Sequence, residues 1–471
     1  MKNITPDGKQ AEVLALPAKG HLVVLGTAGS GKTTMALLRA IQLSSRPGDE
    51  KVLLVTFNGA LVDYMRNIAN EVPSKLNVEN YHKFARGYLN YRAKMPRWNG
   101  IIESAEKLRL ITDAVSVLKD QYPEESTFRR PIEFFVDEIT FIERFGFTDL
   151  DSYYDAERIG RSSANIKRDN RKWIYAVYIK YLELREKSGR KYDWDDLAMY
   201  VYQEMLNDSA PRRYTHIIVD EGQDFSPMMI KSLVKAVADG GSFSFFGDVA
   251  QQIYGSRLSW RDSGINTDRI WRFNVNYRNP ATIVDFATDI TKSKYWRQDT
   301  DMVETNVKIA QGPKPVLIKF LDREKETFWV VERAVAAGKN SSVVIVCRNR
   351  TDIETFRRRL AEKGCSAIVI NKDTAGFPNV KAVYLSTFHA VKGLEFENVF
   401  IPYLSGDKLP DADVVGKALT KSDAYADEIK LLYVAVTRSK YGLYMSFCEE
   451  LSPLFPAESQ HYDYYDEEAL N

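Results

Sequence analysis

Short apolar runs, separated by longer segments of helical periodicity, dominate the hydrophobic pattern of the chain. Four such runs lie at 21–25, 51–55, 217–219 and 243–246. A second set lies at 343–347, 367–370, 383–386, 399–401 and 443–447. Buried parallel strands appear in a sequence as continuous apolar runs, and their alternation with helices favours a parallel α/β fold. The two sets therefore predict two α/β lobes.

The segment between 51–55 and 217–219 has a different pattern. Residues 86–196 are rich in aromatic and charged side chains, with helical periodicity and no strand alternation. We therefore predict a first lobe from residues 1–85 and 197–280, a helical accessory insertion at 86–196, and a second lobe at 281–458. Residues 459–471 carry acidic side chains among tyrosines and predict a loosely ordered acidic tail.

The composition of the chain limits the class of protein but does not indicate a binding partner. The chain has 471 residues, 44% of them hydrophobic, and a formal net charge of +1, so a local basic groove is compatible with it but a uniformly basic coat is not. Its three cysteines lie far apart and lack metal-ligand spacing, so the sequence indicates neither a disulfide framework nor a zinc site. No stretch approaches the ~20 apolar residues of a membrane span. We expect a cytoplasmic protein with no membrane partner.

A glycine-rich segment follows directly after the first apolar run. It consists of Gly26, Thr27, Ala28, Gly29, Ser30, Gly31, Lys32 and Thr33. This is the P-loop pattern in its required context, with a strand before it and a helix-compatible segment after it. Its backbone N–H groups surround phosphates, Lys32 reaches the terminal phosphates, and Thr33 offers a hydroxyl to Mg²⁺. We predict a nucleotide site that also includes Ala28, Ser30 and Thr34.

Carboxylates and an amide stand at the ends of two further apolar strands. Asp220 would hold Mg²⁺, and the adjacent Glu221 would orient and deprotonate an attacking water. Gln251 follows the run at 243–246, where an amide is placed to sense a γ-phosphate. Acid pairs are common at solvated strand ends, but phosphoryl transfer needs both a metal and a base. The pair and the P-loop together predict nucleotide hydrolysis.

With three later motifs, these residues resemble the UvrD/Rep/PcrA group of superfamily 1 helicases. The later motifs are Asn276–Pro280, Thr387–Phe396 and Leu432–Arg438, and the resemblance runs nearly end to end. It implies two RecA-like P-loop NTPase lobes with ATP and Mg²⁺ between them. It also implies movement along DNA from 3′ to 5′.

The resemblance assigns roles to five further residues of the nucleotide site. Gln10 is similar to the family's adenine-reading glutamine, and Tyr277 to the tyrosine that stacks on adenine. Arg278 resembles an arginine that contacts the γ-phosphate, and Glu395 a glutamate that meets the ribose. Arg438 resembles the arginine finger that reaches the γ-phosphate across the lobe interface.

The family resemblance also implies a nucleic-acid track, which consists largely of rings near polar or basic groups. The candidates are Phe57, Asn58, His82, Tyr254, Trp260, Thr387 and His389. Such side chains stack on bases and hold phosphates without reading sequence, so we expect single-stranded DNA, with duplex DNA or RNA left open. Ser256 replaces a tryptophan of the family, and Trp260 is a substitute out of register. A basic run at 158–172 is either a solvated face or a phosphate-tracking ridge.

The interval from Arg278 to Thr387 is too short for the large accessory subdomain of the family. Unwinding by the chain alone is therefore in doubt, and a protein partner such as a nuclease or a repair or defence factor fits. One rival is a GTPase, since Thr420–Asp423 resembles a guanine-reading motif but lacks a preceding strand. Another is an ATPase switch or adaptor without unwinding. Repair, plasmid replication and phage defence stay open.

Overall fold

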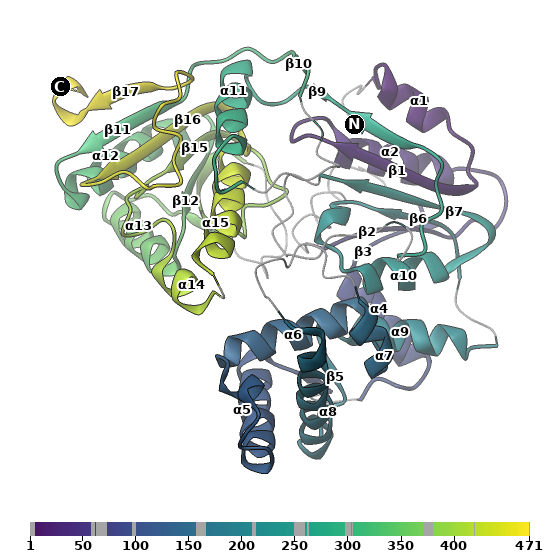
Figure 1. Cartoon of the computed structure of the whole chain (residues 1–471). Helices are drawn as coiled ribbons and strands as arrows, with labels where there is room; N and C mark the ends of the chain where they lie inside the picture. Colours follow the sequence, from purple (N-terminus) through teal and green to yellow (C-terminus); the bar gives the residue numbers. More distant parts are fainter. Residues whose placement is uncertain are drawn as a thin grey trace.

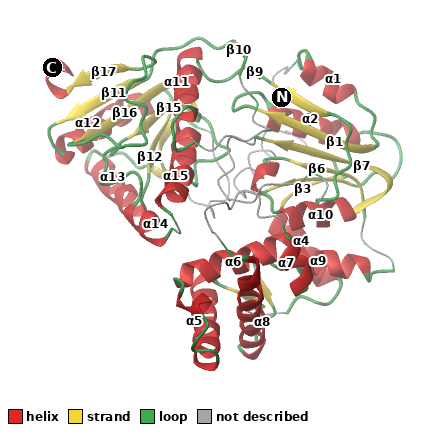
Figure 2. Cartoon of the chain, viewed as in Figure 1, coloured by secondary structure: helices red, strands yellow, loops and turns green. Residues whose placement is uncertain are grey.

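The computed structural model contains two α/β lobes and a helical subdomain that extends from the first lobe (Figure 1). It describes residues 5–57, 62, 73–96, 100–156, 166–209, 213–248, 260, 263–296, 303, 305–370, 380–418 and 420–470. Each lobe has a sheet with helices on its faces, whereas the subdomain is mostly helical (Figure 2). The predicted α/β class with two RecA-like lobes is confirmed.

The first lobe is built on a six-stranded sheet of order β3-β2-β6-β7-β1-β8, in which all pairs are parallel. The strands are β1 (Gly20–Gly26), β2 (Val52–Thr56), β3 (Leu76–Asn80), β6 (Tyr214–Val219), β7 (Val237–Gly247) and β8 (Ile270–Phe273). The helices are α1 (Lys9–Ala15), α2 (Lys32–Ser44), α4 (Tyr81–Tyr91), α9 (Leu197–Leu206) and α10 (Pro227–Lys235).

Successive residues of β1 enter different cores of this lobe. Val23 and Leu25 pack in one core with residues of α4, α9 and α10, whereas Leu22 and Val24 pack in the other with residues of α1 and α2. Side chains alternate across a strand, so both faces of the sheet are covered. This explains why the strand has a continuous apolar run.

The helical subdomain has a core of its own. Its main helices are α5 (Ser104–Gln121), α6 (Ile132–Phe145), α7 (Leu150–Asp155) and α8 (Arg171–Lys187), with short 3₁₀ turns at Ser126–Arg129 and Arg168–Asn170. Ile111, Phe135 and Ile174 lie in its core with no exposed surface. The parallel pair β4 (Ile101–Ile102) and β5 (Tyr192–Asp193) joins the segments that enter and leave the subdomain.

The second lobe has a seven-stranded sheet of order β13-β14-β12-β15-β16-β11-β17, also parallel throughout. The strands are β11 (Val316–Phe320), β12 (Ser342–Cys347), β13 (Ile368–Ile370), β14 (Ala382–Thr387), β15 (Phe396–Ile401), β16 (Ser439–Cys448) and β17 (Asp463–Asp466). The helices are α11 (Ala281–Thr291), α12 (Arg323–Gly338), α13 (Arg350–Glu362), α14 (Ala412–Lys417) and α15 (Lys421–Val436). A short pair, β9 (Val275–Asn276) and β10 (Val307–Lys308), lies where the chain passes between the lobes.

The expectation of a loosely ordered tail after residue 459 is wrong. Residues Asp463–Asp466 form β17, which pairs in parallel with β11, and a 3₁₀ turn follows at Glu467–Leu470. Asp463 also forms an ion pair with Lys314, and Glu467 forms one with Lys325. An edge strand buries little of either face, so polar side chains are compatible with it.

The residues between Arg278 and Thr387 that the structure describes are used by the second lobe itself, from α11 to β14. None of the described helices combines the length and the apolar composition that a membrane span requires.

Candidate functional site

The P-loop connects β1 to α2 and depends on two glycines. Gly29 and Gly31 have φ angles of 75° and 79°, in a region that other residues rarely adopt. A Cβ at Gly29 would lie 2.4 Å from Asn276 Oδ1, and one at Gly31 would lie 2.9 Å from Gln10 Nε2. α2 begins at Lys32, so its N-terminal N–H groups lie at the loop, which is the arrangement that binds phosphates.

Lys32 folds back onto the loop that carries it. Its Nζ donates to the carbonyl oxygens of Gly26 and Thr27 at 2.9 and 2.7 Å, and lies 3.5 Å from Asp248 Oδ2. Phosphate oxygens would make stronger, charge-assisted hydrogen bonds than these neutral carbonyls. The ammonium group of Lys32 could therefore exchange these carbonyl oxygens for the phosphate oxygens of a polyphosphate bound in the loop.

Asp220 supplies a buried carboxylate directly after β6. It is 1% exposed, and neither of its carboxylate oxygens has a hydrogen-bond partner of normal geometry among the described residues. Burial and the charge of Glu221 raise the pKa of Asp220 to about 7, against the opposing effect of the nearby Thr33 hydroxyl. A buried carboxylate without partners is costly unless a cation or a proton compensates it. Asp220 and Thr33 fit Mg²⁺, which prefers oxygen ligands.

Glu221 has a φ of 52°, a conformation that is uncommon outside glycine and is concentrated at functional sites. Burial disfavours the ionised form, but the charges of Lys392, Lys32 and Arg438 outweigh it and lower the pKa of this carboxyl. Gln223 Nε2 donates to Glu221 Oε2. The carboxylate is thus ionised and held in place, as a proton acceptor needs to be.

One pocket at the seam between the lobes collects most of the predicted nucleotide residues. It is lined by Ala28, Gly29, Gly31, Lys32, Thr33, Thr34 and Glu221 on one side and by Arg278, Gly393, Glu395 and Arg438 on the other. Arg278 forms an ion pair with Glu395, whose other oxygen lies 2.8 Å from Lys440 Nζ. Side chains distant in sequence therefore face a single cavity.

Arg438 is 2% exposed and is held by its own lobe. Its Nε donates to the Val434 carbonyl at 2.9 Å, Nη1 to the Leu394 carbonyl at 3.4 Å, and Nη2 to Thr437 Oγ1 at 3.2 Å. Burial and the charge of Arg278 lower the pKa of Arg438 to about 10. The guanidinium therefore remains protonated at pH 7.

Gln10 and Tyr277 lie beside the P-loop from two different segments. Gln10 Nε2 donates to the Ser30 carbonyl at 2.9 Å, and the Tyr277 N–H donates to the Gly29 carbonyl at 3.0 Å. Tyr277 is 38% exposed. Burial, followed by the charge of Asp7, raises the pKa of its hydroxyl. An amide and an accessible ring near one loop are suited to contact the planar base of a nucleotide. The predicted role of both residues is contact with adenine.

A buried ion pair that the sequence did not reveal joins the two lobes. Lys392, in the segment after β14, pairs with Asp224, in the 3₁₀ turn Gly222–Asp224 after β6. Burial raises the pKa of Asp224 to about 6, although Lys392 favours its charged form. Lys392 lies within the motif Thr387–Phe396 and Asp224 three residues after Glu221, but no spacing rule relates positions 168 residues apart.

The comparison with protein families agrees with this geometry. Residues 7–267 match the model described as the UvrD/REP helicase N-terminal domain, which covers more than half of the chain. The chain belongs to the UvrD/Rep helicase family. Residues 371–450 match the UvrD-like helicase C-terminal domain, so the predicted family resemblance is confirmed in both lobes.

The match to this UvrD/Rep-family chain covers different shares of the relatives' lengths. It is 26% identical over 339 residues to the putative ATP-dependent DNA helicase YjcD of Bacillus subtilis, a match that covers 66% of this chain and 41% of YjcD. A probable DNA helicase of Mycoplasma pneumoniae is 23% identical over 90% of this chain and 80% of its own length. The chain thus spans only about two fifths of the length of YjcD.

Two of the predicted nucleic-acid residues of the first lobe form a ring cluster. The Phe57 ring lies edge-on to His82, with centroids 5.6 Å apart. Trp194, which we did not predict, packs edge-on against His82, with ring centroids 5.1 Å apart. Burial lowers the pKa of His82 to about 4, so it is a neutral ring at pH 7. Trp194 directly follows β5 and belongs to none of the motifs that predicted the other residues.

The other candidates are spread over both lobes. Thr387 ends β14, and its Oγ1 accepts from the Ala390 N–H at 3.2 Å. His389 is exposed. Trp260 packs on Phe245 of the first-lobe core, with centroids 5.0 Å apart. Gln251, Asn58 and Tyr254 lie outside the described residues, and all these roles stay predictions.

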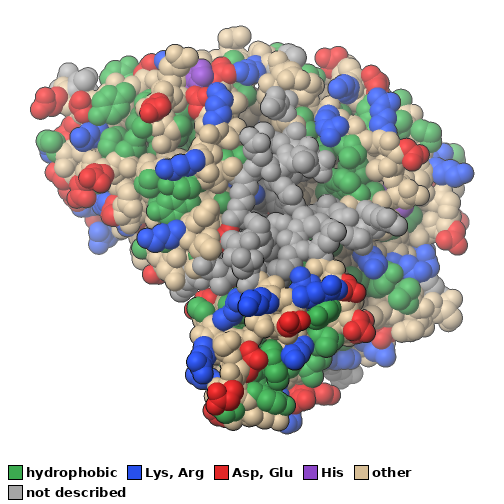
Figure 3. All heavy atoms as spheres, viewed as in Figure 1, with side chains coloured by type: hydrophobic (Ala, Val, Ile, Leu, Met, Phe, Trp, Pro, Cys, Tyr) green, Lys and Arg blue, Asp and Glu red, His purple; other side chains and the backbone are tan. Residues whose placement is uncertain are grey.

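The described part of the basic run is occupied by contacts within the helical subdomain. Arg171 Nη1 donates to the carbonyls of Tyr153, Tyr154 and Ala156. Arg168 pairs with Asp155. These contacts favour the solvated-face interpretation over a phosphate-tracking ridge. Elsewhere, Lys and Arg side chains gather along the edge of this subdomain nearest the lobes (Figure 3).

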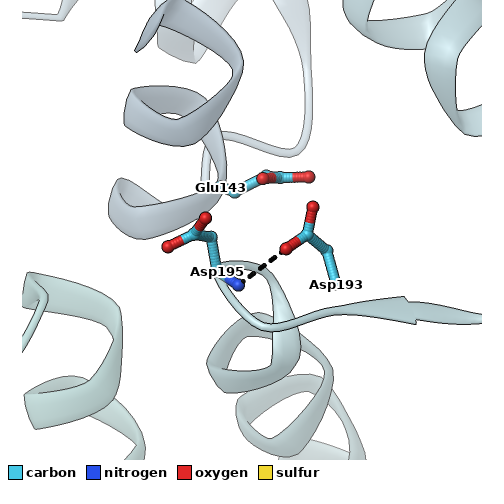
Figure 4. A group of neighbouring side chains, drawn as sticks. All are labelled: Glu143, Asp193 and Asp195. Carbon is cyan, nitrogen blue, oxygen red and sulfur yellow. Dashed lines mark hydrogen bonds between the residues drawn. The ribbon is translucent and has the colours of Figure 1, made fainter. Parts of the chain in front are cut away.

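Three carboxylates of the subdomain have the spacing of a metal site, but a lysine occupies it. Glu143, Asp193 and Asp195 lie close together (Figure 4), with one ligand atom of each within 4.8 Å of the others. Lys107 Nζ lies 2.8, 2.7 and 3.1 Å from them, respectively. Their charges raise the pKa of Lys107 well above its usual value despite burial. The ammonium ion thus lies where a metal ion would have to bind, and Arg144 adds a second cation at Asp195.

Proposed function

We propose that this chain hydrolyses ATP at the seam between its lobes and uses the cycle to move along single-stranded DNA from 3′ to 5′. One observation carries the proposal: a single pocket is lined by the P-loop and Glu221 from one lobe and by Arg278, Glu395 and Arg438 from the other side. A site divided in this way couples nucleotide state to lobe separation.

The chemistry follows from the charges around the pocket. The N–H groups of the P-loop and Lys32 would bind the phosphates, while Thr33 and Asp220 would hold Mg²⁺, which supplies charge neutralisation at the phosphate oxygens. Glu221 is ionised and would accept the proton of the attacking water. The proposal depends on these groups acting on one γ-phosphate.

Two cations would link that γ-phosphate to the second lobe. Arg278 now pairs with Glu395, and Arg438 bonds neutral acceptors of its own lobe. A γ-phosphate would offer both guanidinium groups a stronger partner, and its loss after hydrolysis would release them. Repetition of this closing and opening would move a strand bound across both lobes.

The direct test is ATP turnover measured with and without single-stranded DNA. Turnover should rise when DNA is added, and Lys32→Ala should abolish it in both conditions. Turnover that DNA leaves unchanged would favour the alternative, an ATPase switch or adaptor that does not move. Absence of wild-type turnover would refute the proposal.

We further propose that the chain alone translocates better than it unwinds and that a partner assists it. The described residues between Arg278 and Thr387 lie mostly in the second lobe, so that among the described parts of the chain the helical subdomain is the candidate to engage a duplex junction. A relative from Lactococcus lactis, named exonuclease/helicase subunit RexA, is 26% identical over 153 residues, 29% of this chain and 12% of its own length. Its name favours a nuclease as the kind of partner.

Displacement of streptavidin from biotinylated single-stranded DNA would measure translocation, and separation of a 3′-tailed duplex would measure unwinding. We expect the first and little of the second. Processive unwinding by the purified monomer would contradict this second proposal without affecting the ATPase proposal.

A further inference from the structure

Two asparagines connect the P-loop to the arginine of the second lobe. Asn276 is 2% exposed and Asn279 is 1% exposed, and they lie on either side of Tyr277 and Arg278. Neither amide had a predicted role of its own. Buried amides are costly unless they are hydrogen-bonded, so their partners indicate what they hold together.

Asn276 uses all four of its hydrogen-bonding positions. Its Nδ2 donates to the Ala28 carbonyl of the P-loop at 2.8 Å and to Asn279 Oδ1 at 3.1 Å. Its Oδ1 accepts the backbone N–H groups of Arg278 and Asn279 at 2.9 and 2.8 Å. A side-chain amide has two donors and two acceptor positions, and reversing it would place donors against donors. Its orientation is therefore fixed.

Asn279 extends the connection to the second lobe. Its Nδ2 donates to the carbonyls of Thr437 at 2.9 Å and Ser439 at 2.6 Å. These residues are the two neighbours of Arg438 in the chain. One side chain therefore holds the backbone on both sides of the predicted finger.

Close packing makes this connection stiff at its P-loop end. Asn276 atoms lie within 2.8 Å of where a Cβ of Gly29 would stand, and the Gly29 carbonyl accepts the Tyr277 N–H. Neighbouring carbonyls of the loop, at Ala28 and Gly29, are thus both held by the segment that carries Arg278. A displacement of the loop would be transmitted to this segment.

We infer that Asn276 and Asn279 are positioning residues that couple the P-loop to Arg438, so that nucleotide in the loop sets the place of the finger. This inference rests on the proposed ATPase. Since the amides touch backbone and each other, they act through Arg438 and Arg278 and not on the γ-phosphate itself.

The test is Asn279→Asp, which keeps the shape and the acceptor for Asn276 but removes both donated bonds to the second lobe. We expect kcat for ATP to fall on the order of 10²-fold, the effect of a misplaced catalytic group, with the KM for ATP nearly unchanged. Asn398→Asp is the matched control, since Asn398 Nδ2 donates to Ser341 Oγ within the second lobe; its kcat should match wild type.

A double-mutant cycle decides whether the asparagine acts through the arginine. In an Arg438→Ala background, Asn279→Asp should cause no further loss of kcat, because coupled residues are not additive. Additive losses, or a raised KM with kcat unchanged, would overturn the inference. Should Asn279→Asp fail to fold in a thermal melt, Asn276→Asp, which keeps both accepted bonds and loses both donated ones, is judged by the same criteria.

Amide hydrogen exchange without nucleotide separates this inference from the proposed function. Asn279→Asp should speed exchange of the Arg438 N–H, which donates to the Ala435 carbonyl, and of the Phe396 N–H, which donates to the Arg438 carbonyl. Unchanged exchange at both amides would overturn the coupling even if the wild type hydrolyses ATP. A wild type without turnover would refute the proposed ATPase, while this measurement would still judge the connection.

Discussion

Replacement of Arg438 by alanine removes one of the two guanidinium groups that face the nucleotide pocket. Its guanidinium donates to two carbonyls and one hydroxyl of its own lobe, and its pKa of about 10 keeps it charged at pH 7. An arginine finger contributes about 10³-fold or more to phosphoryl transfer, which corresponds to about 4 kcal/mol of transition-state stabilisation. We therefore expect kcat to fall on the order of 10³-fold.

The affinity for ATP should change little, because the phosphates would be bound mainly by the P-loop and Lys32. The assay is steady-state turnover with saturating single-stranded DNA, combined with equilibrium binding of a fluorescent ATP analogue. Arg438→Lys serves as the control, since it keeps a charge but loses the planar fork that makes several hydrogen bonds, and it should recover only part of kcat. A fall in affinity with an unchanged hydrolytic rate would refute the reasoning and make Arg438 a binding or structural residue.

Further predictions concern the proposed base, DNA binding and the buried ion pairs of the helical subdomain. Glu221→Gln should retain ATP and Mg²⁺ binding while turnover collapses, and unchanged steady-state turnover would refute its role as the base. DNA affinity should vary little with sequence and fall with salt with a logarithmic slope of about 0.7 per phosphate contacted; a strong preference for one sequence in a binding competition would contradict this. Lys107→Met should lower the free energy of unfolding by about 3–5 kcal/mol at pH 7, because it removes the buried ammonium ion that Glu143, Asp193 and Asp195 share, whereas Lys180→Met, which removes an exposed pair with Glu183, should change it little in the same urea titration. Burial acts against ionisation of Asp195, but Lys107 and Arg144 lower its pKa to about 2; its stabilising contribution is present above an unfolded pKa of about 3.9 and is lost as the pH falls toward 2. Lys107→Met should weaken this acid dependence, and identical unfolding curves for the two lysine variants would contradict the role of Lys107.

The strands and the loop between β1 and α2 were predictable because local rules govern them. A strand buried on both faces must be apolar throughout, so the runs at 21–25 and 343–347 correspond to β1 and β12. The P-loop needs particular residue types at fixed spacing, which makes it visible in one segment of sequence. The resemblance to the family then predicted that Glu395 and Arg438 of the second lobe face the same site, and both line the pocket at the P-loop.

Other features depend on contacts between distant segments and were not visible in the sequence. Asp224 and Lys392 meet only when the lobes come together, and Lys107 finds its carboxylates only within the folded subdomain. The strand at Asp463–Asp466 was missed because its composition is that of a solvated segment. Hydrogen bonds to β11 decide its conformation, and these do not depend on side-chain type.

The position of that last strand bears on how the protein should be shortened or tagged. The match to the C-terminal family domain ends at residue 450, so a truncation guided by that boundary would remove β17 and uncover the backbone of β11. An uncovered strand edge pairs readily with another chain, and self-association of such a fragment would reflect the lost strand instead of a natural oligomer. The C-terminus lies at the side of the second lobe away from the first (Figure 1), so a label attached there, beyond β17, would leave the lobe interface clear.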